Sequence, residues 1–378
     1  MIRFNFPHLV GNELAYIQDV LDTGRLAGDG KYTKACSEIL ENYLGSTGKV
    51  LLTHSCTAAL EMAALLADIK PGDEVIMPSY TFVSTANAFV LRGGIPVFID
   101  IRPDTLNIDE KLIEAAISPR TKAIVPVHYA GVSCEMDAIM TIAKKYNLLV
   151  IEDAAQALGS SYKGRKLGTI GDFAAFSFHE TKNIISGEGG ALVVNNPSFI
   201  ERAEIIREKG TNRSRFFRGE VDKYTWVDIG SSYLPSELVA AFLYAQLQHI
   251  DKINGYRKEI WHEYAERLSG LVHEGLITLP TVPSDGVFNA HLFYILTKNT
   301  EKQKQVLAAL NREQIGAVFH YVPLHSTEFG AKLGRVGSKM KYTDDLANRL
   351  IRLPIYPKLT EENIKKICNA VIENVMKL

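Results

Sequence analysis

The feature of this sequence that most limits its fold is a series of strand-length apolar segments alternating with helical patterns. Seven such segments lie at 49–55, 74–80, 95–101, 123–129, 148–154, 173–179 and 190–196. Helical spacing of apolar residues occurs between several of them, at 57–69, 84–92 and 136–146. Continuous apolar strands that alternate with helices are typical of a mostly parallel sheet covered on both faces. We therefore predict an α/β fold built on a seven-stranded sheet.

The remaining sequence predicts a second, smaller domain. A chain of 378 residues exceeds what one ordinary hydrophobic core accommodates. A long helical pattern runs from Leu238 to about Leu271. Beyond it, strands are predicted at 290–297 and 317–324, and helices near 300–311, 342–350 and 360–376. We expect a large domain over residues 1–250 and an α+β domain over residues 251–378.

Charge and cysteine usage exclude several classes of protein. The net charge of −1 gives no general attraction to nucleic acid or to an anionic membrane. The four cysteines are far apart and show neither metal-ligand nor disulfide spacing, so no metal is expected. The sequence has no leader pattern and no apolar run of about 18 residues, so neither export nor membrane insertion is expected. These features predict a cytoplasmic protein that binds small ligands.

One lysine, Lys182, lies in a polar, glycine-rich turn between two of the predicted strands. Turns after strands are where a rigid sheet presents reactive groups. An amine held there and partly removed from water has a lowered pKa and can attack a carbonyl group. Taken alone, a solvated turn lysine is the commoner situation, so the interpretation depends on the other strand ends.

Ligands of parallel sheets bind beyond the carboxyl ends of the strands, and these positions carry suitable groups. Asp153 ends the fifth predicted strand, where a carboxylate needs a positively charged partner unless it only caps a helix. Ser55 to Ala58 follow the first strand and enter a helix, which suits either a phosphate or an ordinary N-cap. Phe82, after the second strand, offers a stacking face or a core side chain.

Together these groups match the needs of one cofactor. Pyridoxal 5′-phosphate requires an amine for a covalent link, a carboxylate for its protonated ring nitrogen, a stacking face and an anchor for its phosphate. Lys182, Asp153 and Phe82 supply the first three, and Ser55 to Ala58 with Ser177 supply the last.

Six segments along the chain also carry a resemblance to a known family. They are 71–88 (PGDEVIMPSYTFVSTANA), 126–131 (PVHYAG), 151–157 (IEDAAQA), 176–183 (FSFHETKN), 187–190 (GEGG) and 319–325 (FHYVPLH). They resemble the motifs of the DegT/DnrJ/EryC1/StrS sugar aminotransferases, pyridoxal phosphate enzymes with the aspartate aminotransferase fold, also called fold type I.

This resemblance implies a role for particular residues. Lys182 would link covalently to the cofactor, Asp153 would meet its ring nitrogen, and Gln156 would lie by its phenolic oxygen. Phe82 would cover the ring. The residues implied to hold the phosphate are Thr57, Ala58 and Ser177.

The family resemblance further implies a homodimer with shared active sites. In the family an asparagine of the partner subunit usually reaches the phosphate, and the corresponding segment here is 230–233, so Ser232 would take that role. Cys56 also stands where many relatives have glycine. These departures, with the segments THSCTAALEMAALL and KGTNRSRFFRG, resemble the branch that makes dTDP-4-amino-4,6-dideoxygalactose.

The implied reaction transfers the amino group of L-glutamate to dTDP-4-keto-6-deoxyglucose, giving dTDP-4-amino-4,6-dideoxygalactose and 2-oxoglutarate. Such sugars serve cell-surface polysaccharides, for example enterobacterial common antigen or O-antigen. Lys182 would move the proton between the reacting carbons. Histidines 179, 320 and 325 lie in the matching motifs, although a structural histidine is the alternative for at least one of them.

Three alternatives remain. The enzyme could aminate another nucleotide-linked 4-keto sugar, or it could give the opposite stereochemistry at the carbon that carries the new amine. A sugar 3-dehydratase of this fold would carry histidine in place of Lys182. A non-catalytic ligand-binding homologue would not need Lys182, Asp153 and Gln156, which are all present.

Overall fold

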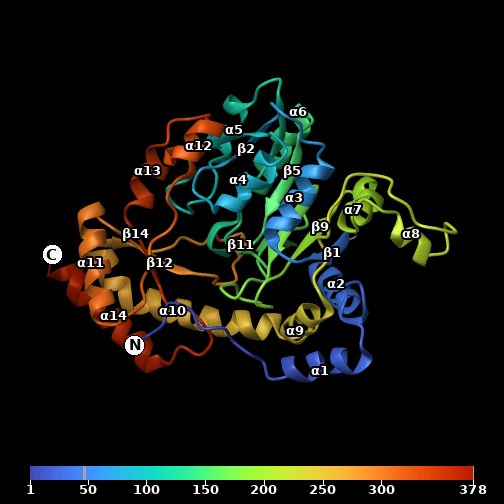
Figure 1. The fold of residues 1–378 in the computed structure, drawn as a ribbon. Coiled ribbons are helices and arrows are strands. Elements are labelled where there is room, and N and C mark those ends of the chain that lie inside the picture. The colour runs from blue at the N-terminus through green and yellow to red at the C-terminus, as the bar shows by residue number, and fades with distance from the viewer. Residues whose placement is uncertain (46–47, 378) are drawn as a thin grey trace.

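An eight-stranded sheet forms the centre of the molecule (Figure 1). The computed structural model describes residues 1–45 and 48–377. The strand order is β1-β9-β8-β5-β4-β2-β3-β13, and β9 runs antiparallel to both of its neighbours while the other pairs are parallel. The strands are β1 (Lys49–Thr53), β2 (Glu74–Pro78), β3 (Ile95–Ile99), β4 (Thr121–Ile124), β5 (Leu149–Asp153), β8 (Phe173–Ser177), β9 (Gly190–Val194) and β13 (Arg335–Val336).

Both faces of this sheet are buried, which explains its uninterrupted apolar strands. Neighbouring residues of one strand, such as Val50 and Leu51, belong to different hydrophobic clusters on opposite faces. Helices α3 (Cys56–Leu66), α4 (Val83–Val90) and α7 (Ile200–Arg207) contribute to one cluster. Helices α2 (Lys31–Leu44), α5 (Glu110–Ala116), α6 (Met136–Tyr146) and α9 (Glu237–Leu247) contribute to the other.

The C-terminal part has a hydrophobic cluster of its own. Its three-stranded sheet has the order β10-β12-β14, and the long helix α10 leads into it from the large sheet (Figure 1). Ile2 at the N-terminus forms a β-bridge with Ile315, so the start of the chain packs on this C-terminal part. The elements are α10 (Ile250–His273), β10 (Ile277–Thr278), β12 (Phe293–Thr297), α11 (Thr300–Arg312), α12 (Glu328–Leu333), α13 (Lys341–Ala347), β14 (Leu350–Leu353) and α14 (Glu361–Met376).

Several short elements complete the described chain. A small sheet of order β11-β6-β7 joins two distant loops of the chain. Helix α8 projects from the body of the protein (Figure 1). The bounds are α1 (Glu13–Thr23), β6 (Ser161–Tyr162), β7 (Arg165–Lys166), α8 (Arg213–Phe217) and β11 (Gly286–Val287).

The α/β class and the mostly parallel sheet are confirmed, with three corrections of detail. The sheet has eight strands rather than seven, because β13 adds a two-residue edge strand too short to form an apolar segment. The strand predicted at 317–324 is absent, because Pro323 lacks an N–H group and only Val318 forms a bridge, with Arg352. The helix predicted near 342–350 ends at Ala347, and its last predicted position, Leu350, already begins the missed strand β14. The division into residues 1–250 and 251–378 stays a prediction.

Within the described residues, no helix is both long enough and apolar enough to cross a membrane.

Candidate active site

A pocket of about 520 Å³ lies at the edge of the large sheet where the parallel strands end. Asp153 and Ser177 close β5 and β8, and both line the pocket. The residues that follow β1 and β2 line it as well, including Ser55 and Thr81. The site is therefore where the topology of a parallel sheet places it.

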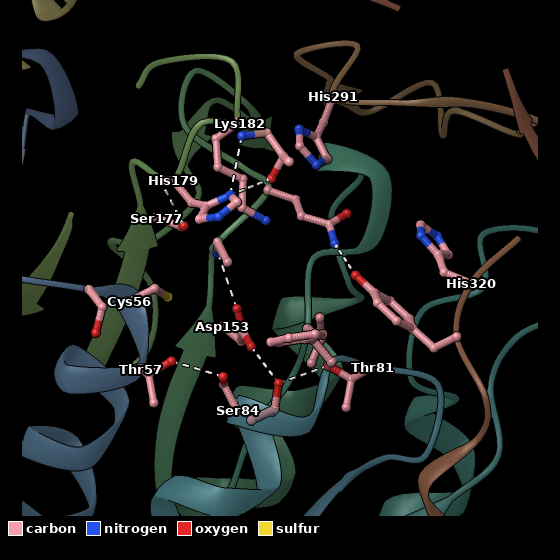
Figure 2. Close-up of a pocket in the computed structure, with 18 of the residues that line it drawn as sticks. Cys56, Thr57, Thr81, Ser84, Asp153, Ser177, His179, Lys182, His291 and His320 are labelled. Carbon is pink, nitrogen blue, oxygen red and sulfur yellow. Dashed lines mark hydrogen bonds between the residues drawn. The ribbon is translucent and has the colours of Figure 1, made fainter. Parts of the chain in front are cut away.

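Six of the predicted residues meet in this pocket (Figure 2). They are Thr57, Phe82, Asp153, Gln156, Ser177 and Lys182. Ala58 is buried in α3 and does not line the pocket. Its backbone N–H donates to Ser55 Oγ at 3.0 Å and is therefore already used. Ser232 is exposed and lies outside the pocket of its own chain. Its role in a partner subunit stays a prediction.

Asp153 is held at the end of β5 by two hydrogen bonds. Its Oδ2 accepts from the Thr85 hydroxyl at 2.7 Å, and its Oδ1 accepts from the Ala155 N–H at 3.1 Å. Thr85 also bonds Thr81 through their hydroxyls at 2.8 Å. These neutral donors orient the carboxylate, and no cation forms an ion pair with it among residues 1–45 and 48–377. Its charge is thus available to a cationic ligand.

Lys182 lies in a turn that is closed by backbone hydrogen bonds. Its own N–H donates to the His179 carbonyl at 2.9 Å, and Phe178 and Gly189 are joined by another backbone bond of 2.9 Å. Burial lowers the pKa of the Lys182 amine, and Cys56 and Asp153 oppose this effect. The structure therefore favours the neutral, nucleophilic form more than water does.

The start of α3 offers donors for an anion. In the described chain, the backbone N–H groups of Cys56 and Thr57 have no hydrogen-bond partner, as expected for the first turn of a helix. The Thr57 hydroxyl donates to Ser84 Oγ at 2.8 Å, and Ser177 lies on the same side of the pocket (Figure 2). Free N–H groups, hydroxyls and the positive end of the helix dipole suit a phosphate.

Gln156 faces the pocket from the loop after β5. Its Oε1 accepts from the Ala130 N–H at 2.7 Å, which leaves Nε2 to donate to the Tyr321 hydroxyl at 3.2 Å. The ring of Tyr321 stacks on His320, with centroids 4.2 Å apart. Phe82 is 57% exposed and its ring lies 6.2 Å from that of Tyr321. Aromatic surface is therefore available to cover a flat ligand.

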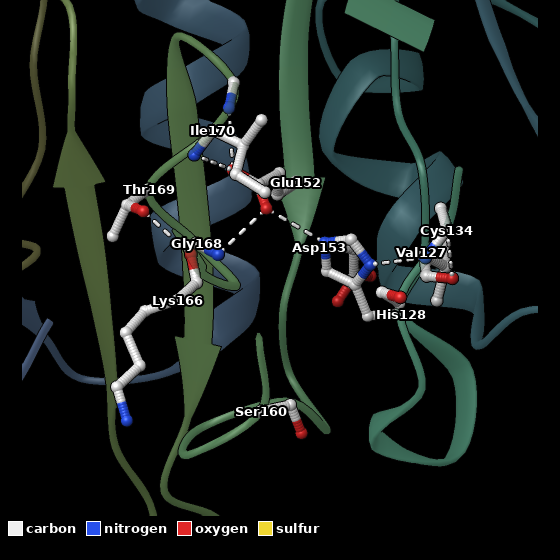
Figure 3. Close-up of polar contacts among 12 residues, drawn as sticks. Val127, His128, Cys134, Glu152, Asp153, Ser160, Lys166, Gly168, Thr169 and Ile170 are labelled. Atoms are coloured by element: carbon white, nitrogen blue, oxygen red, sulfur yellow. Dashed lines mark hydrogen bonds and ion pairs between the residues drawn. The ribbon is translucent and has the colours of Figure 1, made fainter. Parts of the chain in front are cut away.

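A buried network fixes the strand that carries Asp153 (Figure 3). Glu152 points away from the pocket and accepts from the N–H groups of Gly168, Ile170 and Gly171 at 2.7–2.8 Å. It also accepts from His128 Nε2 at 2.9 Å. His128 Nδ1 accepts from the backbone N–H of Cys134 at 3.2 Å, so Nε2 is the ring atom that donates to Glu152. Burial raises the pKa of Glu152, but these hydrogen bonds outweigh burial and the pKa lies below its ordinary value.

The three histidines of the matching motifs have different environments. His179 and His320 line the pocket, whereas His325 does not. His325 is held by Ser79, whose Oγ lies 2.7 Å from its Nδ1. His325 therefore contacts other parts of the fold rather than the pocket.

Sequence reasoning missed several residues of the pocket. Thr85 positions Asp153, and Arg257, His291 and Arg352 reach the pocket from the C-terminal part of the chain. An arginine within the otherwise apolar strand LIRL was the available indication for Arg352. No local pattern marked Arg257 in the long helix α10.

The donor set of the pocket fits pyridoxal phosphate. The pocket combines an amine, a carboxylate with no cationic partner, an aromatic cover and free N–H groups at a helix start. In residues 1–45 and 48–377, no cluster of three or more histidine, cysteine, aspartate or glutamate side chains could hold a metal ion.

Comparisons with known proteins match this chain to one family over nearly its whole length. The profile of the DegT/DnrJ/EryC1/StrS aminotransferase family matches residues 7–372. The chain is 35% identical to the spore coat polysaccharide biosynthesis protein SpsC of Bacillus subtilis over 383 residues, covering 98% of this chain and 96% of that protein. It is 33% identical to the GDP-perosamine synthase of Caulobacter vibrioides over 372 residues, covering 97% and 96%.

A solved structure shows the same fold with the expected cofactor. The Streptococcus pneumoniae protein Spr1654 has been solved in its PMP form, and it superposes on all of this chain with a TM-score of 0.91 and 26% identity. The match covers 100% of both chains. Its PLP form gives a TM-score of 0.90.

Proposed function

Because this chain belongs to the DegT/DnrJ/EryC1/StrS family of pyridoxal phosphate-dependent sugar aminotransferases, we propose that it transfers the amino group of L-glutamate to a nucleotide-linked 4-keto-6-deoxy sugar. The specific substrate we propose is dTDP-4-keto-6-deoxyglucose, with dTDP-4-amino-4,6-dideoxygalactose and 2-oxoglutarate as products. The observation that carries the chemistry is the meeting of Lys182 and Asp153 in one pocket beside the free N–H groups of α3.

Different residues of the pocket have different roles in the proposed reaction. When bound, pyridoxal phosphate supplies the electron sink for the carbon that loses its proton. Asp153 would hold a proton on the ring nitrogen, and the first turn of α3 with Ser177 would hold the phosphate. The Lys182 amine takes a proton from the α-carbon of the amino donor and delivers a proton to the sugar carbon in the second half of the reaction. Its lowered pKa favours the neutral form that this step requires.

A second substrate class is supported by one relative. The GDP-perosamine synthase of Caulobacter vibrioides is named for a GDP-linked product, and it is 33% identical over nearly the whole chain. An alternative is therefore amination of a different nucleotide-linked 4-keto sugar by the same residues.

We also propose that the enzyme is a cytoplasmic homodimer. Each active site would contain Lys182 of one subunit and Ser232 of the other. The support for the dimer is the family resemblance of segment 230–233, and a two-fold interface permits such sharing. The four cysteines are free in the structure, as is usual in reducing compartments.

One experiment tests the reaction and its substrate. The purified enzyme, loaded with pyridoxal phosphate, should be yellow and should bleach with L-glutamate. The bleached enzyme is then incubated with a panel of nucleotide-linked 4-keto sugars, and the products are analysed by mass spectrometry and NMR. We expect the dTDP-linked 6-deoxy sugar to be aminated and the colour to return. Failure to bleach with any amino acid would rule out transamination, and amination of only a GDP-linked sugar would establish the alternative.

A further inference from the structure

His291 is a pocket residue whose tautomer is fixed by its neighbours. It lies just before β12, lines the pocket and is only 4% exposed. Its Nδ1 atom lies 3.0 Å from Asn183 Oδ1. The Asn183 amide is oriented by two further contacts, because its Nδ2 donates to the Asn289 backbone carbonyl and to Asn254 Oδ1, both at 2.8 Å. A backbone carbonyl can only accept, so Asn183 Oδ1 must be the atom that faces His291, and His291 Nδ1 donates to it.

The other ring nitrogen of His291 is therefore an acceptor. A neutral imidazole with its proton on Nδ1 has a lone pair on Nε2. Burial and nearby positive charges lower the pKa of His291 well below its ordinary value of 6.5, so the ring stays neutral at pH 7. In the part of the chain that the structure describes, Nε2 makes no hydrogen bond. The pocket thus contains a fixed acceptor that has no donor.

Asn183 also links this histidine to the reactive lysine. Asn183 directly follows Lys182 in the chain, and Figure 2 shows Lys182 and His291 on the same side of the pocket. Among the charges that act on His291, that of Lys182 has the largest effect. The Lys182 amine makes no hydrogen bond with any described residue. A donor and an acceptor that both lack a partner consequently lie close together.

The network that holds the imidazole is buried. Asn183, Asn254 and Asn289 are at most 6% exposed. Asn289 Nδ2 donates to the Gln156 backbone carbonyl at 2.8 Å, so the same network reaches the loop after β5. The backbone N–H of His291 donates to Asn289 Oδ1 at 3.1 Å. These contacts hold His291 in one orientation, as a group that acts on a reacting atom requires.

We propose that His291 Nε2 accepts a hydrogen bond from the Lys182 amine whenever this amine is free, and that Asn183 positions the histidine for this contact. The role in catalysis rests on the proposed function, in which the amine takes a proton from the α-carbon of the amino donor and becomes an ammonium group. An acceptor beside the amine stabilises the positive charge as it forms. It also directs the amine toward that carbon. Hydrogen bonds from an ionised donor are about twice as strong as neutral ones.

Two substitutions separate the two nitrogen atoms of His291. His291→Asn places an amide N–H group where Nδ1 was and removes the acceptor at Nε2. His291→Gln places an amide oxygen near the position of Nε2 and removes the donor to Asn183. His273→Asn, at an exposed histidine outside the pocket, is the control. Circular dichroism confirms that each variant is folded.

The first measurement needs neither cofactor nor turnover. The full-length protein, freed of cofactor, is labelled with trace acetic anhydride over a series of pH values, and acetylation of Lys182 is quantified by peptide mass spectrometry. We expect the midpoint of the labelling curve to lie below 10.5 in wild type, because burial lowers the pKa of Lys182. It should be lower still in His291→Asn, because loss of the acceptor destabilises the ammonium form. It should stay close to wild type in His291→Gln and in His273→Asn.

Other groups also affect the ionisation of these two residues, and all of them are kept in the variants. The charged or titratable groups that act on Lys182 or on His291 are Cys56, Asp153, Arg257, His320 and Arg352. A difference between His291→Asn and His291→Gln therefore reports on the acceptor alone.

The second measurement follows the holoenzyme. Single-turnover bleaching by L-glutamate should be about tenfold slower in His291→Asn than in wild type, as expected for one lost hydrogen bond to a charged group. His291→Gln should bleach at close to the wild-type rate. It should instead lower the urea midpoint, because Asn183 Oδ1 loses its buried donor. A histidine with a purely structural role would not separate rate from stability in this way.

Three outcomes would overturn the proposal. They are wild-type labelling and bleaching in His291→Asn, equal losses in both His291 variants, and normal bleaching of His291→Asn followed by slow return of colour with a keto sugar. The last result would assign Nε2 to a sugar hydroxyl.

Two further outcomes keep the test decisive. If His291→Asn does not fold, nitrogen NMR of wild type labelled at histidine decides, with His291→Gln used to assign the signal. An unprotonated, hydrogen-bonded Nε2 supports the contact, and a protonated or unbonded Nε2 refutes it. The expected labelling pattern in a protein that no amino acid bleaches would support the contact and refute the proposed function.

Discussion

Replacement of Asp153 by asparagine removes one negative charge from the pocket and changes almost nothing else. The Asp153 carboxylate accepts from Thr85 and from the Ala155 N–H. An asparagine can keep the bond from Ala155 through its oxygen. The Thr85 hydroxyl can rotate to accept from the new amide group, because it also has Thr81 as a partner. We therefore expect normal folding and a site whose shape is preserved.

The effect on rate follows from the lost charge. Two opposite charges at about 3 Å interact by roughly 5 kcal/mol at an effective dielectric constant of about 20. Asp153 is 6% exposed, so most of this interaction with a protonated ring nitrogen should be realised. Allowing for the hydrogen bond that asparagine can still form, we expect a loss of about 3 kcal/mol, on the order of a hundredfold in rate.

Single-turnover bleaching by L-glutamate measures this effect, with cofactor content determined for each preparation. Thr85→Val is the matched comparison, because it keeps the charge and removes only the hydroxyl that orients it. It should cost about tenfold, as expected for one hydrogen bond. If Asp153→Asn bleaches at the wild-type rate with full cofactor occupancy, Asp153 only caps the following turn and the assignment is wrong.

Three further predictions follow from the site and its support. Lys182→Met should abolish turnover, yet it should raise the melting temperature of the cofactor-free protein at pH 7. A lysine whose pKa is lowered in the folded state destabilises the fold below its ordinary pKa of 10.5. The gain in melting temperature should therefore vanish near that pH. Glu152→Gln should destabilise the protein by about 3 kcal/mol in urea unfolding at pH 7, because an amide group would face buried donors. Glu114→Gln, at an exposed ion pair with Lys145, is the control and should leave the urea midpoint unchanged. The Glu152 effect should shrink as the pH falls below 4.5, since the stability from a depressed carboxyl pKa is lost there. An equal mixture of the inactive Lys182→Ala and Ser232→Glu homodimers should recover about a quarter of wild-type activity after subunit exchange. About half the dimers at random pairing would be hybrids, and each hybrid would have one intact site. No recovery despite demonstrated subunit exchange would refute the shared site.

The residues that the sequence identified lie at the ends of the strands it predicted. Asp153 and Ser177 could be placed because each closes an apolar strand, and parallel strands bring their carboxyl ends to one edge of the sheet. Lys182 follows the strand that ends at Ser177, so its place in the pocket was predictable as well. A local pattern was sufficient here, because a short chain distance separates each group from its strand.

The start of α3 shows what a local motif can and cannot indicate. The motif correctly located a helix N-terminus, yet it did not reveal which N–H groups remain free. Ser55 adopts an N-cap conformation and takes the N–H of Ala58, so the free donors are those of Cys56 and Thr57. One side-chain rotamer determined that distribution.

The amino-acid sequence by itself determined seven of the eight strands of the large sheet, the helices between several of them and the residues at the strand ends, because hydrophobic periodicity is a local property. Only the tertiary structure decided that Arg257, His291 and Arg352 complete the pocket. They come from a long helix, a loop and a strand of the C-terminal part, more than 70 positions from Lys182. Their approach depends on how the C-terminal core packs beside the large sheet, and periodicity carries no information about which distant segments meet.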